Sequence, residues 1–331
     1  MGEILKIRSF SAIIDSMSEK KKRLLTGLQP SGALHIGNYF GTIKPIVDLF
    51  TDHEGLLMVA DYHALTSVRN PEELRKSIVE NAKDYFAAGL NLDNAILFQQ
   101  SSVPEHAELA WIFDCLVTVS FLELGHAYKD KVAKGLEANA GLFTYPMLMA
   151  ADILLYDTDI VPVGEDQRQH VEYAREAAAK FNNAYGTTFK EPQELISKTV
   201  GVVPGTDGQK MSKSYKNTIP LFATRDEIQK AVMSIVTDSS GDKPEHVYAI
   251  HTLYKTDAEL TPLYEEKKGK YKDLKEALIE DIDTYIAPMR EKRASISDED
   301  VRLVLKEGGE KARTLASAKM AEVRKKVGVT L

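Results

Sequence analysis

The sequence contains a single cysteine, Cys115, and it has no apolar run long enough to cross a membrane. One cysteine excludes a disulfide bond within the chain and any zinc or iron–sulfur site built from several cysteines. An excess of positive charge is also lacking: the formal net charge is −7 over 331 residues, which argues against a protein that coats nucleic acid indiscriminately. These absences favour a cytoplasmic protein of a reducing compartment, with no membrane partner.

The first 22 residues contain serines and lysines, but Glu3, Asp15 and Glu19 interrupt them. Transit peptides are poor in acidic residues. We therefore interpret residues 1–22 as an N-terminal extension, with a mitochondrial leader as the minor alternative.

Residues 23–223 alternate short apolar segments with helical patterns. Strands are predicted over 24–26, 55–65, 95–102 and 160–164. A helix is expected to begin at Asn70 and Pro71, because Asn caps helices well and Pro suits the first helical position. This alternation predicts an α/β domain with a parallel sheet, which binds ligands beyond the C-terminal ends of its strands.

Strand patterns stop near residue 224, and apolar residues then recur with a helical period. Residues 224–331 are therefore predicted to form a second, all-helical domain. Its last part, 301–331, carries eight Lys and Arg against three acidic residues. Such a bias suggests a basic surface for an anionic partner, and the alternative is a solvated helix face.

A glycine-rich stretch, TGLQPSGALHIGNYFG (residues 26–41), follows the first predicted strand. It matches neither the common dinucleotide fingerprint nor the P-loop. A helix beginning here would offer unpaired N–H groups to phosphate, and glycine would let a flat ligand lie on the backbone. His35 and Asn38 are three residues apart and would share one helix face. The alternative is a glycine-rich turn with a surface histidine.

A second stretch, GQKMSKSYKN (residues 208–217), places Lys210 and Lys213 three apart on a glycine-flanked loop. Two lysines on such a loop are suited to holding a polyphosphate while charge builds on it. A solvated loop is the alternative for this stretch taken alone. Together, however, the HIGN step and the later KMSKS sequence resemble the two signatures of the class I aminoacyl-tRNA synthetases. That resemblance implies a Rossmann-like catalytic domain over 23–223 and a helical anticodon-binding domain over 224–331.

Asp152 lies in a strongly apolar run, and no Lys, Arg or His occurs between Lys134 and Arg168. A buried carboxylate without a partner is costly, so its partner must come from elsewhere in the fold or from a ligand. Tyr145, Met149 and Asp152 fall on one helix face, which would suit an indole ring whose N–H is donated to Asp152. The alternative is a pairing of Asp152 with a distant arginine or a backbone amide.

This segment resembles the bacterial-type tryptophanyl branch of the family, whereas the tyrosyl branch usually has Gln at the position of Met149. The resemblance implies a catalytic set of His35, Lys131, Lys210 and Lys213. It implies an ATP-binding set of Gln29, Gly37, Asn38, Lys129, Gly164, Asp166, Lys210, Met211, Ser212 and Lys213. It implies a tryptophan-binding set of Leu25, His63, Tyr145, Met149, Asp152, Val161, Val163 and Gln167. Two positions depart from the branch: Leu25 stands where an aromatic residue can occur, and His35 where Thr is common.

The reaction implied is activation of L-tryptophan by ATP, with Mg²⁺ on the phosphates, and transfer to tRNA(Trp). No metal ligand of the protein is implied, and the family predicts a homodimer. Three other readings are open: a tyrosyl-tRNA synthetase, a non-catalytic RNA-binding paralogue, and a small-molecule nucleotidyltransferase.

Overall fold

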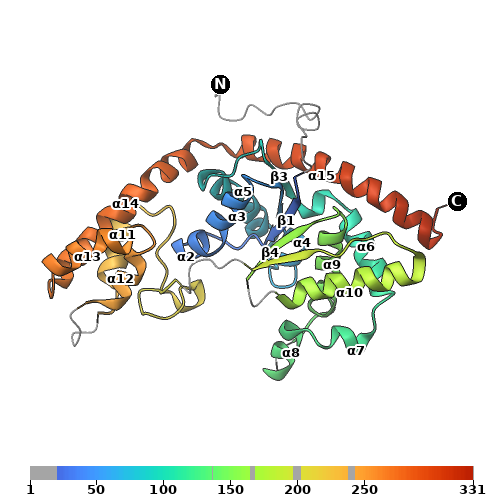
Figure 1. The fold of residues 1–331 in the computed structure, drawn as a ribbon, viewed down its shortest axis with the longest axis horizontal. Helices are drawn as coiled ribbons and strands as arrows, with labels where there is room; N and C mark the ends of the chain where they lie inside the picture. The colour runs from blue at the N-terminus through green and yellow to red at the C-terminus, as the bar shows by residue number, and fades with distance from the viewer. Residues whose placement is uncertain (1–20, 136, 165–167, 197–202, 238–242, 331) are drawn as a thin grey trace.

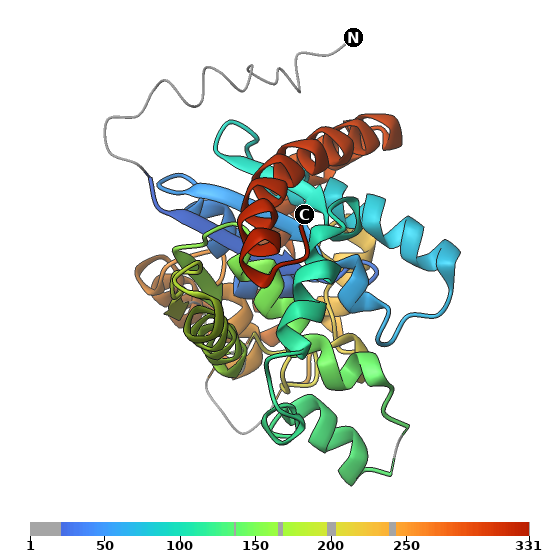
Figure 2. The same cartoon turned by 90° about the vertical axis from the view of Figure 1, so that its right-hand side faces the viewer.

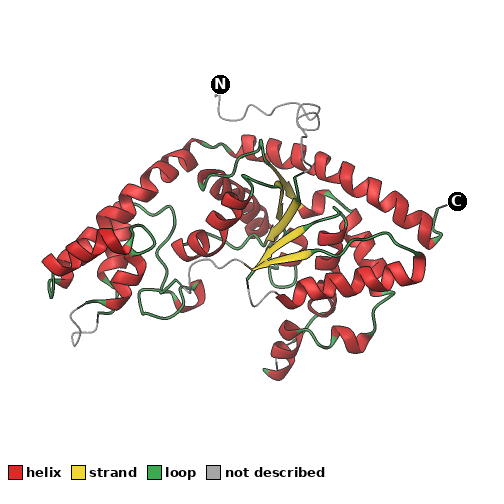
Figure 3. Cartoon of the chain, in the orientation of Figure 1, coloured by secondary structure: helices red, strands yellow, loops and turns green. Residues whose placement is uncertain are grey.

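The computed structural model describes residues 21–135, 137–164, 168–196, 203–237 and 243–330. Most of the predicted N-terminal extension, residues 1–20, lies outside these ranges. The described part centres on a five-stranded, wholly parallel sheet with the strand order β3-β2-β1-β4-β5 (Figures 1 and 3). Its strands are β1 (Arg23–Leu28), β2 (Glu54–Val59), β3 (Ala95–Gln99), β4 (Ile160–Val163) and β5 (Gln193–Ile196). Strands β2 and β3 lie on one side of β1, and β4 and β5, which come later in the chain, lie on its other side. The strand order therefore reverses at β1, and ligands of such sheets bind at the point of reversal.

Alternating side chains of the central strands enter two apolar cores, one on each face of the sheet. Leu24 and Leu57 belong to the core that contains α3 (Lys44–Leu49) and α5 (Pro71–Ala87). Their neighbours Leu25 and Leu56 belong to the core on the other face, which is covered by α6 (Glu105–Asp114), α9 (Ala140–Leu154) and α10 (Arg168–Tyr185). The period of two in a strand produces this division. The predicted Rossmann-like α/β architecture is confirmed.

The strand predictions were correct in place but too long at two C-terminal ends. Strand β2 stops at Val59, and residues predicted to continue it form the short helix α4 (Asp61–Ala64). Strand β3 stops at Gln99, and a 3-10 turn, Gln100–Ser102, follows. Strand β5 was missed, because its four residues, QELI, form no apolar run.

Asn70 caps α5 as predicted: its side-chain oxygen accepts from the backbone nitrogens of Glu72 and Glu73 at 3.0 and 3.4 Å. The remaining elements of this part are α2 (Ile36–Asn38) with the π-helical turn Tyr39–Ile43 that joins it to α3, and α7 (Val119–Leu122) and α8 (His126–Ala133). No helix in the described ranges is long and apolar enough to span a membrane.

The chain after residue 224 is helical throughout its described part. It contains α11 (Arg225–Met233), α12 (Glu245–His251), α13 (Asp257–Glu266), α14 (Tyr271–Ser295) and α15 (Asp298–Val327). Helices α11 to α13 gather with the first half of α14 at one end of the molecule (Figure 1). The predicted apolar face of α14 is buried there, at Leu274, Leu278, Ile282 and Ile286.

Helix α15 lies within the predicted helical region, 224–331, but it packs on the α/β part. It turns back over that part and packs against β3, α5 and α6 (Figures 1 and 2). A Cβ atom on Gly308 would lie 1.8 Å from the carbonyl oxygen of Leu97 in β3, so only glycine permits this approach. Ala312 and Met320 enter the core that α6 and α9 share. The apolar face of α15 is therefore buried on the sheet side, and the division of the chain at residue 224 stays a prediction.

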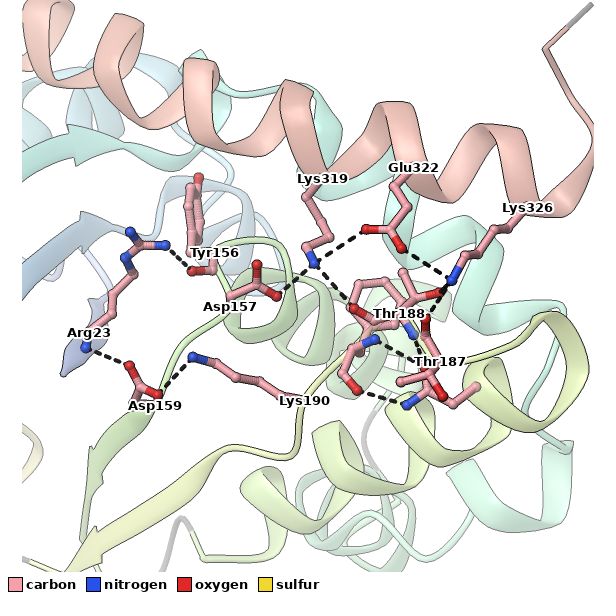
Figure 4. A network of polar contacts seen from close by, with 12 residues as sticks. Arg23, Tyr156, Asp157, Asp159, Thr187, Thr188, Lys190, Lys319, Glu322 and Lys326 are labelled. Atoms are coloured by element: carbon pink, nitrogen blue, oxygen red, sulfur yellow. Dashed lines mark hydrogen bonds and ion pairs between the residues drawn. The ribbon is translucent and has the colours of Figure 1, made fainter. Parts of the chain in front are cut away.

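Half of the eight cations on 301–331 have partners within the protein itself, and the predicted basic surface for an anionic partner stays a prediction. Arg313 pairs with Glu105 and Arg324 with Glu108, both on α6. Figure 4 shows the second half of this contact, where Lys319 lies 2.7 Å from Asp157 and Lys326 binds the 187–188 turn. Arg313, Lys319, Arg324 and Lys326 thus bind the protein's own acidic and polar groups.

Candidate active site

The HIGN step forms the start of α2, and His35 is its N-cap. The backbone N–H of Asn38 donates to His35 Nδ1 at 3.2 Å, and the backbone N–H of His35 donates to Asn38 Oδ1 at 3.1 Å. His35 is only 7% exposed, which contradicts the alternative of a surface histidine. Burial, together with the charge of Lys213, lowers the pKa of His35 to about 4. The ring is therefore neutral at pH 7, and because Nδ1 accepts, its proton is on Nε2.

Gly37 allows the two signature segments to meet. A Cβ atom there would lie 2.9 Å from His35 Nδ1 and 3.3 Å from the Cβ of Met211. Met211 itself is buried, and its backbone N–H donates to the carbonyl of Val203 at 2.9 Å. The glycine is thus required by the protein's own packing, in addition to any contact with a ligand.

Asn217 organises the loop that carries the second signature. Its Oδ1 accepts from the backbone N–H of Ser212 at 2.8 Å, and its Nδ2 donates to Asp207 Oδ1 at 2.7 Å and to the carbonyl of Lys210 at 3.2 Å. Beyond it, the N–H of Ile36 donates to the carbonyl of Ile219 at 3.0 Å. These bonds join the loop to the start of α2, although the two signatures are far apart in sequence.

Lys213 reaches the turn that precedes α2, where its Nζ donates to the carbonyl of Ser31. Asn81 of α5 holds the same turn: it accepts from the N–H of Ser31 at 3.0 Å and donates to the carbonyl of Gly32 at 3.1 Å. Burial lowers the pKa of Lys213, while the carboxyl of Asp84 opposes that shift. The predicted catalytic residue His35 and the predicted ATP-binding residues Gly37, Asn38, Met211, Ser212 and Lys213 are therefore brought together.

Asp152 is 2% exposed and has three side-chain neighbours that can donate to it. His63 Nε2 lies 2.7 Å from Oδ2, while Gln100 Nε2 and His106 Nδ1 lie 2.8 and 2.6 Å from Oδ1. The partners come from elsewhere in the fold, and they are neither an arginine nor a backbone amide. Burial raises the pKa of Asp152, but His106 and His63 together hold it well below its usual range. The carboxylate is thus ionised and acts only as an acceptor.

The other predicted tryptophan-binding residues surround this carboxylate or line the core beside it. The Tyr145 ring lies 6.3 Å from that of His63, and its hydroxyl is 2.5 Å from His170 Nε2. Leu25, Val161 and Val163 are buried in one apolar core, against which Met149 packs. Gln167 and the predicted ribose-binding residue Asp166 lie outside the described residues.

Five predicted positions are not joined to these two groups by any side-chain contact within the described residues. Gln29 and Gly164 are exposed just beyond β1 and β4. Lys129 and Lys131 are on α8, which packs on α9 and lies apart from α2 in Figure 1. Lys210 is exposed on its loop. Their roles stay predictions.

The sequence analysis missed four polar residues that organise the site: Asn81, Gln100, His106 and Asn217. Two of them could have been recognised from their positions in the sequence. Gln100 follows the end of a parallel strand, where ligand-binding side chains gather, and Asn217 lies inside the KMSKS-containing stretch. Asn81 and His106 are ordinary helix residues in sequence, so only their tertiary contacts reveal them.

The comparisons with known proteins agree with this geometry. The family described as tRNA synthetases class I (W and Y) matches residues 17–297. The chain belongs to this family. It is 46% identical over 319 residues to the tryptophan–tRNA ligase of Fusobacterium nucleatum, covering 93% of this chain and 98% of the relative. It is 45% identical to that of Rhodopirellula baltica, covering 93% and 99%.

A crystal structure of tryptophanyl-tRNA synthetase from Campylobacter jejuni, complexed with ADP and tryptophan, superposes with a TM-score of 0.87. It is 42% identical and covers 92% of this chain and 99% of its own. The resemblance to bacterial-type tryptophanyl-tRNA synthetases predicted from the sequence is therefore confirmed, and the chain is an aminoacyl-tRNA synthetase.

Proposed function

We propose that the chain is a tryptophan–tRNA ligase, which activates L-tryptophan with ATP and transfers it to tRNA(Trp). The observation that carries this proposal is the ionised carboxylate of Asp152, buried beside an apolar core that Met149 flanks. An acceptor-only group in such a place selects a flat apolar ring that carries one N–H donor. The relatives of 39–46% identity that are named tryptophan–tRNA ligases support the same choice.

In the first step a carboxylate oxygen of tryptophan attacks the α-phosphorus of ATP. The bond from that phosphorus to the bridging oxygen breaks, leaving tryptophanyl-adenylate and pyrophosphate. The substrate carboxylate is itself the nucleophile, so catalysis depends on positioning and on stabilising charge at the phosphates. His35 can donate from Nε2, and Lys213 and Lys210 supply positive charge from the loop opposite. Lys131 and Lys129 are proposed to approach the phosphates from α8.

Mg²⁺ is proposed to enter with ATP, bound to its phosphate oxygens, as part of the substrate. Within the described ranges no group of three or more His, Cys, Asp or Glu side chains could hold a metal ion. In the second step the 3′-terminal ribose hydroxyl of tRNA(Trp) attacks the adenylate carbonyl and releases AMP. The helices after residue 224, up to the end of α14, are proposed to contact the anticodon region.

We propose a cytoplasmic homodimer whose interface includes the end of α6 and helix α7. Trp111 of α6, Val119 of α7 and Leu124, just after α7, are 69%, 65% and 50% exposed. Exposed apolar side chains of this size are candidates for such an interface. Light scattering should give a mass of two chains, and a Trp111→Ser variant should shift it toward one.

The test of the proposed activity is pyrophosphate exchange into ATP with each of the twenty amino acids. We expect exchange with tryptophan alone. Exchange driven by tyrosine would favour the tyrosyl alternative, and the absence of exchange with any amino acid would favour an RNA-binding paralogue or another nucleotidyltransferase.

A further inference from the structure

We propose that Gln100, His106 and Tyr156 are positioning residues for Asp152, leaving its Oδ2 atom as the acceptor for the ring N–H of the amino acid. This inference rests on the proposed function, because it assigns how that carboxylate is held for its role. The three residues come from different parts of the chain: the turn after β3, helix α6 and the turn after α9.

Gln100 is fully buried, and both ends of its amide are used. Its Oε1 accepts from the backbone N–H of Tyr62 at 3.1 Å. That bond fixes the orientation of the amide, so the NH₂ group faces Asp152 and donates to Oδ1 at 2.8 Å. The backbone of α4 thereby sets the direction of a donor on the carboxylate.

His106 is also fully buried, and its ring is held between two polar neighbours. Its Nδ1 atom lies 2.6 Å from Asp152 Oδ1, within ion-pair distance, although the N–H is not aligned with that oxygen as a hydrogen bond requires. Its Nε2 atom is hydrogen-bonded to the hydroxyl of Tyr156 at 2.7 Å. The imidazole stacks on Phe98, with ring centres 6.2 Å apart and planes 22° apart. Tyr156 thus holds the imidazole in its place against Asp152 Oδ1.

The two oxygens of Asp152 are therefore unequal. Among the described residues, Oδ1 accepts from Gln100 and lies 2.6 Å from His106 Nδ1, whereas Oδ2 has a single partner, His63, at 2.7 Å. Each carboxylate oxygen has two lone pairs, so Oδ2 retains capacity for one more donor. Since the donors on Oδ1 also favour the ionised form, losing one weakens Asp152 as an acceptor and frees it to rotate.

The test is a Tyr156→Phe variant, which removes one hydroxyl and keeps the ring. Pyrophosphate exchange is measured with tryptophan and with the isosteric analogue 3-(benzothiophen-3-yl)alanine, which has sulfur in place of the ring N–H. We expect the ratio of kcat/KM between the two amino acids to fall about tenfold through a higher KM for tryptophan. The KM for ATP should stay at the wild-type value, because the nucleotide is held by other residues.

The matched control is Tyr264→Phe in the helical end of the molecule. Tyr264 hydrogen-bonds His251 Nδ1 at 3.1 Å, and His251 Nε2 lies 2.7 Å from Asp281, so the same Tyr–His–Asp arrangement occurs there. The Tyr264→Phe substitution should lower the unfolding midpoint as Tyr156→Phe does. It should leave the ratio of kcat/KM between tryptophan and the analogue unchanged. A Gln100→Met variant removes the second donor and should reduce the ratio as well.

An unchanged ratio in folded Tyr156→Phe and Gln100→Met proteins would overturn the inference. A wild-type protein that exchanges with tryptophan but does not prefer it to the analogue would also overturn it, and the proposed function would stand. No tryptophan-dependent exchange in the wild-type protein would instead mean that the proposed function itself is wrong.

Discussion

The pH dependence of stability should report the buried imidazole of His35. Its pKa falls from 6.5 to about 4 in the folded chain, first through burial and then through Lys213. Below pH 6.5 the unfolded chain binds a proton that folded His35 does not bind until about pH 4, so the contribution of this group to stability falls as pH falls through that window. At about pH 5 the loss is about 2 kcal/mol, from 1.36 kcal/mol per pH unit over the interval below 6.5.

The measurement compares the wild-type chain with a His35→Asn variant. Asparagine is a good N-cap that can still accept from the N–H of Asn38, but it does not titrate. Urea unfolding between about pH 7 and 4.5 should show the wild type losing about 2–3 kcal/mol relative to the variant.

Other titrating groups are common to the two proteins and cancel in this difference. Asp84, which interacts with Lys213, is one of them: burial raises its pKa to about 6 against the opposing effect of Arg293, so it contributes stability as pH falls. Parallel stability curves for the wild type and His35→Asn would refute the assignment of a buried, neutral His35.

Three further predictions follow from the site and from α15. Lys213→Ala should slow adenylate formation at least tenfold in pyrophosphate exchange while equilibrium binding of tryptophan barely changes, because its amine lies at the turn before α2; wild-type turnover would contradict this. Asp152→Ala should reduce the preference for tryptophan over phenylalanine by about 1–3 kcal/mol, since a buried acceptor is lost, and an unchanged preference would count against the pocket. Gly308→Ala should destabilise the chain by about 1–3 kcal/mol, because its Cβ would meet the backbone of β3. Gly41→Ala, which meets no atom within 4 Å, is its control, and equal unfolding midpoints for the two variants would show that α15 does not need this glycine.

Much of the fold was predictable from local patterns. Strand β2 is predicted by its apolar run, and helix α5 by its helical period and the Asn70 cap. These signals act over a few neighbouring residues. The two signature stretches can also be recognised from the sequence alone, because their glycines, imidazole and paired lysines are residue types suited to binding phosphates. Strand β5 carried no such pattern, because a four-residue strand with polar residues is stabilised by its pairing with β4.

The sequence by itself determined the family, the α/β class and the main candidate residues, because these depend on residue types and spacings that persist along the chain. Only the tertiary structure decided what surrounds Asp152, since His63, Gln100 and His106 approach it from residues 46 to 89 positions away. It also decided that α15 lies on the sheet and that four of its cations bind the protein's own acidic and polar groups. The burial and the protonation of a side chain depend on its neighbours in space. The distances to those neighbours cannot be read from the linear sequence.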